Sequence, residues 1–200
     1  MNQHALIVVD YQNDFAEGGS LAVPWARSLA PFIQETMLRT KASSWLIIAT
    51  RDWHPDNTVH FAPGWRWPVH CVAGTEWAKY IDGIDPNRID QEIFKGYKNS
   101  DDGYSGFEGT TELMWKRETG FEVLPSSHSL LEVLRQAKVH TLEIVWLATD
   151  FCVYATARDA IENWFDTRIL TPGIRAVNVP WLPSWEDRLR ELAERWAKIL

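Results

Sequence analysis

Cysteine is scarce in this chain, because Cys71 and Cys152 are the only two among 200 residues. Two cysteines are too few for the disulfide framework of a small secreted protein, so a free and reactive thiol is a reasonable hypothesis. No apolar run approaches the roughly 20 residues that a membrane helix needs. Asp10 also interrupts the apolar run at residues 5–9 before it could serve as a signal-peptide core. We therefore expect a cytoplasmic protein with no membrane partner.

Positively charged residues are fewer than negatively charged ones: 20 Lys and Arg stand against 27 Asp and Glu, which gives a net charge of -7. Nonspecific nucleic-acid binding depends on Lys and Arg that neutralise phosphates, so we expect no nucleic-acid partner and a small molecule instead. The 46% hydrophobic and 24% charged residues are ordinary for globular proteins and exclude disordered and fibrous classes. A chain of this length favours one domain spanning residues 1–200.

Tryptophan is the residue type in excess, with 12 in the chain. A large aromatic ring buries much surface and usually packs in a core or at a subunit interface. We expect core packing or a subunit interface for most of these rings, so a homo-oligomer remains open.

Strand-like and helix-like patterns alternate along the chain. Short apolar runs rich in β-branched residues predict buried parallel strands at 5–9, 45–50 and 142–148, with weaker candidates at 91–94 and 167–170. Apolar residues at three- and four-residue spacing predict helices at 29–41, 129–137, 152–164 and 185–200. This alternation predicts a single-domain α/β fold with a mostly parallel central sheet and helices on both faces.

Two irregular stretches interrupt the pattern. Residues 52–87 are rich in Pro, Gly, His, Asp and Trp, and residues 96–109 contain four glycines. Loops of this length inside a compact domain usually bind or cover something.

Polar residues follow the predicted strands at their carboxyl ends, where α/β sheets place their sites. Asp10, Asp52, Lys95 and Cys152 occupy these positions. Four distant segments are therefore expected to converge on one edge of the sheet.

Cys152 is predicted to begin a helix, where unpaired N–H groups and the positive dipole end stabilise a thiolate. An isolated cysteine is more often a buried structural residue, which is our hypothesis for Cys71. Asp10 could take the thiol proton and return it to a leaving amine. Lys95 could keep that carboxylate ionised or stabilise developing negative charge. Together they meet the requirements for a nucleophile, a base and an electrostatic partner.

Histidines are concentrated in the first irregular stretch. Asp52, His54, His60 and His70 are all ligand types for zinc, iron or manganese. Asp52 and His54 suit one extended segment, whose alternate side chains point the same way. A polar loop can carry histidines by chance, but we favour a metal site that keeps a position open for substrate or water.

At this point the sequence resembles the nicotinamidases, also called pyrazinamidases, of the isochorismatase-like cysteine hydrolases. The resemblance runs in order from residue 7 to about residue 177. Its segments are IVVDYQNDF and GGSLAV at 7–15 and 18–23, RDWHP, HF, WPVHCV and GT within 51–75, FKG and YSGF within 94–107, and ATDFCV at 148–153.

This resemblance implies an isochorismatase-like three-layer sandwich that hydrolyses nicotinamide to nicotinate and ammonia through a thioester, with pyrazinamide as a further substrate. Cys152 would attack the amide carbon, Asp10 would act as base and then as acid, and Lys95 would complete the triad. One divalent ion, zinc in the first place and iron or manganese as alternatives, would be held by Asp52, His54, His60 and His70. The setting would be nicotinamide salvage toward NAD.

The resemblance also implies how substrate is held. Phe15 and Trp67 would sandwich the pyridine ring, whose nitrogen binds the metal, and Tyr104 would border the pocket. The backbone N–H groups of Ala148 and Cys152 would form the oxyanion hole, next to a cis peptide that joins Leu147 to Ala148.

Three positions depart from the family pattern. Trp146 stands where glycine is common, Phe151 where Tyr or His is common, and Gly103 where serine is common. A ring as large as Trp146 beside the nucleophile turn is expected to affect pocket shape. Two alternatives stay open: an amidohydrolase of the same superfamily acting on another small amide or carbamoyl compound, and a non-catalytic metal- or ligand-binding relative.

Overall fold

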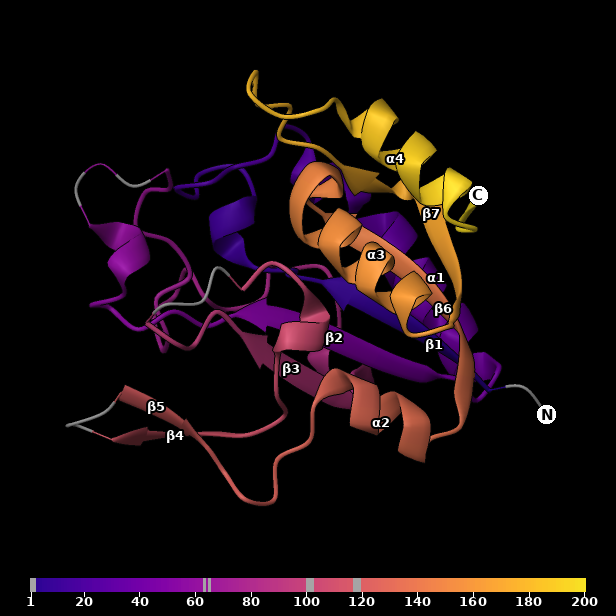
Figure 1. The fold of residues 1–200 in the computed structure, drawn as a ribbon, viewed down its shortest axis with the longest axis horizontal. Helices are drawn as coiled ribbons and strands as arrows, with labels where there is room; N and C mark the ends of the chain where they lie inside the picture. The colour runs from indigo at the N-terminus through magenta and orange to yellow at the C-terminus, as the bar shows by residue number, and fades with distance from the viewer. Residues whose placement is uncertain (1–2, 63, 65, 100–102, 117–119) are drawn as a thin grey trace.

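The computed structural model describes residues 3–62, 64, 66–99, 103–116 and 120–200. Its centre is a six-stranded sheet in the order β3-β2-β1-β6-β7-β8, in which every neighbouring pair is parallel (Figure 1). The strands are β1 (Gln3–Val9), β2 (Leu46–Asp52), β3 (Gln91–Lys95), β6 (Val139–Leu147), β7 (Asp166–Arg175) and β8 (Lys198–Ile199). The predicted α/β class with a mostly parallel sheet is confirmed.

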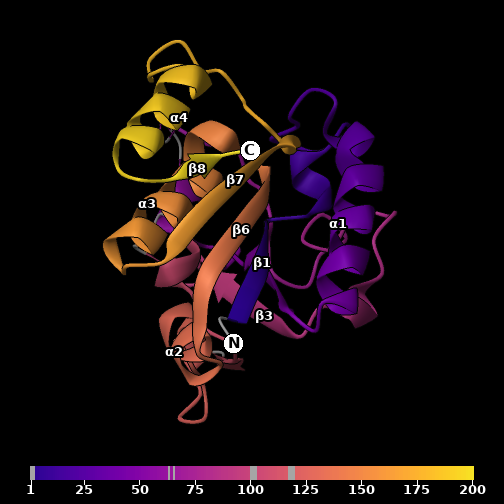
Figure 2. The ribbon, with the colours of Figure 1, turned by 90° about the vertical axis from the view of Figure 1, so that its right-hand side faces the viewer.

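Helices cover both faces of this sheet. Figure 2 shows α1 (Ala30–Ala42) on one side and α3 (Tyr154–Glu162) and α4 (Trp185–Glu194) on the other. Successive strand residues point to opposite faces, so Leu6 and Val8 of β1 pack in the core that includes α1 residues. Their neighbours along β1 pack in the second core, with residues of α2 (Leu130–Gln136), α3 and α4.

The end of the chain differs from its prediction. A helix was expected over 185–200, but α4 ends at Glu194 and β8 then pairs with β7. Trp196 has φ of 81°, a left-handed conformation that stops a helix. The apolar residues after it therefore belong to the edge of the sheet.

A separate antiparallel hairpin, β4 (Leu113–Lys116) and β5 (Gly120–Val123), was not predicted. It projects away from the main sheet in Figure 1. Trp115 packs on Phe121 within it at a ring distance of 5.0 Å, while the Trp115 side chain stays 54% exposed. Four-residue strands on a solvated surface leave little periodicity for a sequence to show.

Most of the described tryptophans lie outside the core, so core packing, one of the two expected roles, holds for few of them. Among the tryptophans that the structure describes, only Trp146 is buried. Six others are exposed: Trp25, Trp77, Trp115, Trp164, Trp181 and Trp196.

The stretch between β2 and β3 is irregular, as predicted. Its described residues form two short 3-10 turns, Val59–Phe61 and Pro86–Arg88, and isolated β-bridges at His54, Val72 and Tyr80. In the described part of the chain, no helix combines the length and the apolar character that crossing a bilayer requires.

Candidate active site and metal centre

The carboxyl edge of the sheet brings together the side chains predicted to carry chemistry. Asp10 follows β1, while Asp52 and Lys95 are the last residues of β2 and β3. Parallel pairing of β2 with β3 sets Asp52 opposite Lys95. Beyond β6, the π-helical turn Thr149–Val153 carries Cys152 toward the same point. A carboxylate oxygen of each aspartate and the Cys152 sulfur all lie within 4.8 Å of one another.

Lys95 is the centre of this cluster and is fully buried. Its Nζ lies 2.9 Å from Asp10 Oδ2, forms a very short hydrogen bond to Asp52 Oδ1, and lies 3.5 Å from Cys152 Sγ. Nζ also donates to the Gly103 carbonyl at 2.5 Å. One ammonium group thus pairs with two carboxylates that the sequence assigned to two separate sites.

Gly103 fits this arrangement because it has no side chain. Its φ is 65°, and an added Cβ would lie 2.4 Å from the Gly96 Cα atom. A serine at this position would displace the backbone that accepts the Lys95 hydrogen bond.

The electrostatics of the cluster make Asp10 a group that can exchange protons near neutral pH. Burial raises the pKa of the Asp10 carboxyl from 3.8 to about 6, while the Lys95 ammonium opposes that rise and the Asp52 carboxylate adds to it. Thr50 donates its hydroxyl proton to Asp10 Oδ1 at 2.7 Å. Burial alone would lower the pKa of Lys95, but Asp10 and Asp52 raise it well above its usual value, so Lys95 is charged.

Cys152 differs from its prediction in one respect. A helix start was expected to favour its thiolate, yet Cys152 lies inside the π-helical turn ahead of α3. Burial raises the pKa of its thiol well above the usual value, although Lys95 lowers it. The resting group is therefore a thiol that needs a base, and Asp10 is in reach.

The predicted metal ligands come from the irregular stretch after β2. His54 forms a one-residue bridge with Val72, in which His54 N–H donates to the Cys71 carbonyl at 3.1 Å. This bridge brings His70 beside His54, with ring centroids 4.7 Å apart. Asp52, His54 and His70 each offer a ligand atom within 4.8 Å of the others, and all three are buried.

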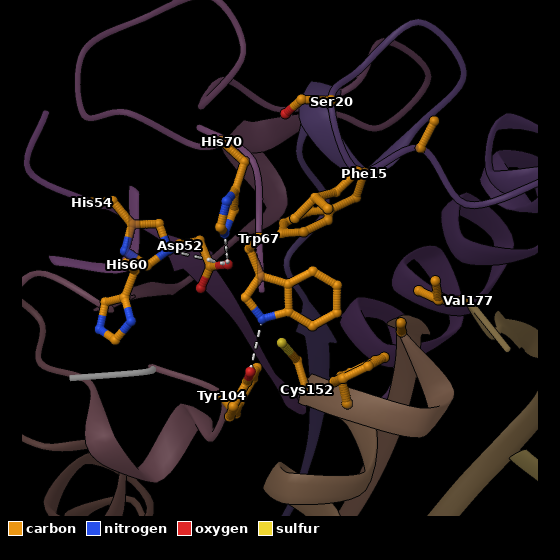
Figure 3. A pocket seen from close by; sticks show the side chains of 14 residues that line it. Phe15, Ser20, Asp52, His54, His60, Trp67, His70, Tyr104, Cys152 and Val177 are labelled. Carbon is orange, nitrogen blue, oxygen red and sulfur yellow. Dashed lines mark hydrogen bonds and ion pairs between the residues drawn. The ribbon is translucent and has the colours of Figure 1, made fainter. Parts of the chain in front are cut away.

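The hydrogen bonds of the two histidines suit a metal. His54 Nδ1 lies 2.8 Å from the Gly96 carbonyl oxygen, and His70 Nδ1 lies 2.8 Å from the Pro68 carbonyl oxygen. Each Nδ1 must then carry the proton, which leaves Nε2 as the lone-pair donor, and metal-binding histidines usually donate their other ring N–H to a carbonyl or carboxylate in this way. The Nε2 atoms face Asp52 Oδ2 at 3.8 Å and 3.9 Å (Figure 3). This donor set fits a divalent ion.

His60 lies beside this trio rather than inside it. Its ring centroid is 6.4 Å from that of His54, and its side chain lines the same cavity. Three of the four predicted ligands are therefore close together, with His60 farther out.

An aromatic cavity of about 260 Å³ connects the metal ligands to Cys152. Phe15, Trp67 and Tyr104 line it, and Trp67 Nε1 donates to the Tyr104 hydroxyl at 2.9 Å (Figure 3). Phe151 also lines it, with its ring 5.0 Å from that of Trp67. The cavity thus has aromatic walls, with the Asp52, His54 and His70 side chains and the Cys152 thiol among its lining.

Two predicted pocket residues lie where β6 ends, and only one of them, Ala148, lines the cavity with its side chain. The Leu147–Ala148 peptide is cis, as expected. Ala148 lines the cavity, whereas the Leu147 side chain packs in the core on the α1 side of the sheet. Leu147 can therefore serve the site only through its backbone.

Trp146 does not shape the cavity, contrary to expectation. It is fully buried in the same core and packs against Tyr11, with ring centroids 4.2 Å apart and the two planes tilted by 41°. The register of β6 with β7 is irregular between Ile144 and Trp146, and Trp146 has φ of 97°, so its ring lies on the α1 side together with its neighbours Val145 and Leu147.

Some lining residues were not predicted. Ser20, Leu21 and Ala22 lie in a segment that the resemblance covered without giving it a role, and Val177 follows β7. The Gly18-Gly19 pair was the available signal for the first group, since it indicates a tight turn beside Phe15. Nothing in the local sequence marks Val177.

Comparisons with known proteins agree with this geometry. A nicotinamidase/pyrazinamidase of Mycobacterium tuberculosis is 40% identical over 179 residues, which cover 86% of this chain and 88% of that protein. The crystal structure of a pyrazinamidase of Pyrococcus horikoshii in complex with zinc is 33% identical, with a TM-score of 0.82 over 99% of this chain and 98% of that one. PnC1 from L. infantum in complex with nicotinate is 30% identical, with a TM-score of 0.81 over 100% of this chain and 92% of that one. Residues 4–181 match the isochorismatase domain, and the chain belongs to that family.

Proposed function

We propose that the protein is a nicotinamidase, which hydrolyses nicotinamide to nicotinate and ammonia through a thioester on Cys152 and also accepts pyrazinamide. The observation that carries this proposal is the position of Cys152 at the floor of an aromatic cavity, 3.5 Å from a lysine that is itself paired with Asp10. The names of its relatives, nicotinamidases and pyrazinamidases, support the same substrates.

Asp10 is the group that moves protons. Its ionised carboxylate takes the Cys152 proton as the sulfur attacks the amide carbon, and then gives that proton to the amine, so that ammonia leaves. It next takes a proton from water, whose oxygen attacks the thioester carbon. The carbon–sulfur bond breaks, nicotinate forms and the sulfur regains its proton. Lys95 favours the ionised carboxylate between these transfers.

The backbone stabilises the charge that develops during both attacks. We assign the oxyanion hole to the N–H groups of Ala148 and Cys152, at the two ends of one short turn. Losing one such donor typically costs about 100- to 1,000-fold in rate.

Asp52, His54, His60 and His70 are the proposed ligands of one divalent ion, with zinc as our choice and iron or manganese as alternatives. When bound, the ion supplies a Lewis acid that holds the pyridine nitrogen of the substrate. Phe15 and Trp67 stack on the ring and Tyr104 borders it, so the amide is directed toward Cys152.

The proposed partner is the small amide, with no role for nucleic acid or a membrane, and the proposed compartment is the cytoplasm. A net charge of -7 and only two cysteines support this assignment. The metabolic setting that we propose is salvage of nicotinamide toward NAD.

Ammonia release from nicotinamide by the purified protein tests the function. Wild type, Cys152→Ala, His54→Ala and a chelator-treated sample are compared, with His140→Ala as a matched control because His140 is exposed on β6. We expect release to vanish with Cys152→Ala, to fall with chelation and His54→Ala, and to return when zinc is added to the chelated protein. No release from metal-loaded wild type would reject nicotinamide and favour another small amide.

A further inference from the structure

Asp14 is a buried carboxylate, 4% exposed, that takes no part in the proposed reaction. It lies in the 3-10 turn Asn13–Phe15, directly before the ring-stacking Phe15. Its Oδ1 accepts hydrogen bonds from Ser20 N–H at 3.0 Å and from the Ser20 hydroxyl at 2.9 Å. Its Oδ2 accepts one from Cys71 N–H at 2.6 Å.

These hydrogen bonds join two separate segments of the chain that line the cavity. Ser20 belongs to the wall that includes Phe15, Leu21 and Ala22, whereas Cys71 directly follows the proposed ligand His70. The Ser20 hydroxyl also lies 2.8 Å from the Val69 carbonyl oxygen, on the His70 side. Figure 3 shows Ser20 and His70 at the same end of the cavity.

The backbone around Asp14 leaves little freedom for another arrangement. Leu21 N–H donates to the Asp14 carbonyl at 3.0 Å, so the chain curls tightly around the carboxylate. An added Cβ at Gly19 would lie 2.3 Å from that same carbonyl oxygen. Cys71 has φ of 44°, a conformation that a hydrogen bond to Asp14 helps to hold.

We propose that Asp14 is a positioning residue. It fixes the cavity wall formed by Phe15, Ser20, Leu21 and Ala22 relative to the loop that carries His70 and Cys71. This inference rests on the proposed function, in which His70 binds the metal ion and Phe15 stacks on the pyridine ring of the substrate. Asp14 touches neither the substrate nor the ion. It acts on both through Ser20 and Cys71.

Asp14→Asn is the informative change, since an amide has nearly the size of a carboxylate but only one acceptor. If its oxygen faces Ser20, its NH₂ group faces the Cys71 N–H, and two donors repel. Loss of an outer contact of this kind typically weakens metal binding by about 10- to 100-fold. The proton-transfer residues Asp10, Lys95 and Cys152 are untouched.

The experiment measures the zinc dissociation constant by competition with a chelator, KM and kcat for nicotinamide at saturating zinc, and the urea midpoint. The matched control is Asp90→Asn, because Asp90 also accepts a backbone N–H, from Ile47 at 2.8 Å, but lies at the other end of β2. We expect Asp14→Asn to weaken zinc binding by about 10-fold or more and to raise KM, with a smaller change in kcat. Asp90→Asn should lower the urea midpoint and leave the zinc constant and KM unchanged.

Ser20→Ala provides a second variant that removes a surface hydroxyl and keeps the Cys71 contact. It should raise KM and leave zinc affinity within about twofold of wild type. The inference is overturned if Asp14→Asn lowers only the urea midpoint, or, should that variant not fold, if Ser20→Ala leaves KM unchanged. A wild type that neither binds zinc nor releases ammonia overturns the proposed function together with this inference.

Discussion

Replacing Lys95 by methionine should destabilise the protein far more than loss of an ordinary salt bridge. The methionine has a similar length but no charge, so Asp10 and Asp52 would remain buried without their shared cation. Removing one partner of a buried ion pair typically costs about 3 to 5 kcal/mol in the free energy of unfolding. A chain of this size has about 5 to 15 kcal/mol, so the variant should still fold and can be measured.

The penalty should depend on pH, because protons can replace the missing cation. In wild type, burial raises the Asp10 pKa to about 6 although Lys95 lowers it, so the Asp10 contribution to stability is fully present below its ordinary pKa and is lost as pH rises through about 6. Without Lys95, both carboxyls of the folded state hold protons at higher pH. The difference from wild type should therefore be largest near pH 8 and shrink toward about pH 5.

Urea unfolding of chelated wild type and Lys95→Met at these two pH values measures the effect. Lys41→Met is the control, because Lys41 pairs with Asp90 and both side chains are 32% exposed. That pair should contribute about 1 kcal/mol or less. The reasoning is refuted if the two variants lose similar stability at neutral pH, or if the Lys95→Met penalty is the same at both pH values.

Three further predictions follow from the site. The ratio kcat/KM for nicotinamide should fall as pH drops through the Asp10 pKa, because the Asp10 base must be ionised; burial raises this pKa to about 6 in the metal-free protein and a cation at Asp52 lowers it, so an acid limb above about pH 6 would mean that another group is the base. In metal-free protein, an alkylating reagent should modify Cys152, 7% exposed on the cavity, before fully buried Cys71, and peptide masses showing equal labelling would contradict this. Trp146→Gly should lower the free energy of unfolding by about 3 to 5 kcal/mol while KM stays within about twofold, and a large rise in KM would show that the ring shapes the pocket after all.

The sheet and its functional edge could be predicted because they depend on strong local signals. Apolar runs marked the central strands, and polar residues at or shortly after the strand ends marked the carboxyl edge. The rule that sites lie at this edge was enough to group Asp10, Asp52, Lys95 and Cys152 before any distance was known.

Features that depend on tertiary contacts could not be predicted in this way. The strand β8 has two residues, and its pairing with β7 is visible only once α4 has stopped. The direction of Trp146 depends on an irregularity in the pairing of β6 with β7 and on its positive φ, so its size alone gave the wrong expectation about the cavity. Val177 reaches the cavity because the buried Asp150 carboxylate accepts the N–H groups of Val177 and Asn178, at 3.0 Å and 2.8 Å.

The sequence motifs assigned to two separate sites a pair of carboxylates that the structure places around one lysine. They assigned Asp10 to a catalytic triad and Asp52 to a metal site, yet one ammonium group, Lys95, pairs with both carboxylates. The Asp52 charge is one of the causes that raise the Asp10 pKa, after burial. Whatever neutralises Asp52 must therefore lower the pKa of Asp10 and favour its ionised, basic form. By the reciprocity of linked equilibria, we expect ionised Asp10 to strengthen cation binding at Asp52, so that proton binding at Asp10 and cation binding at Asp52 oppose each other through the repulsion between the two carboxylates.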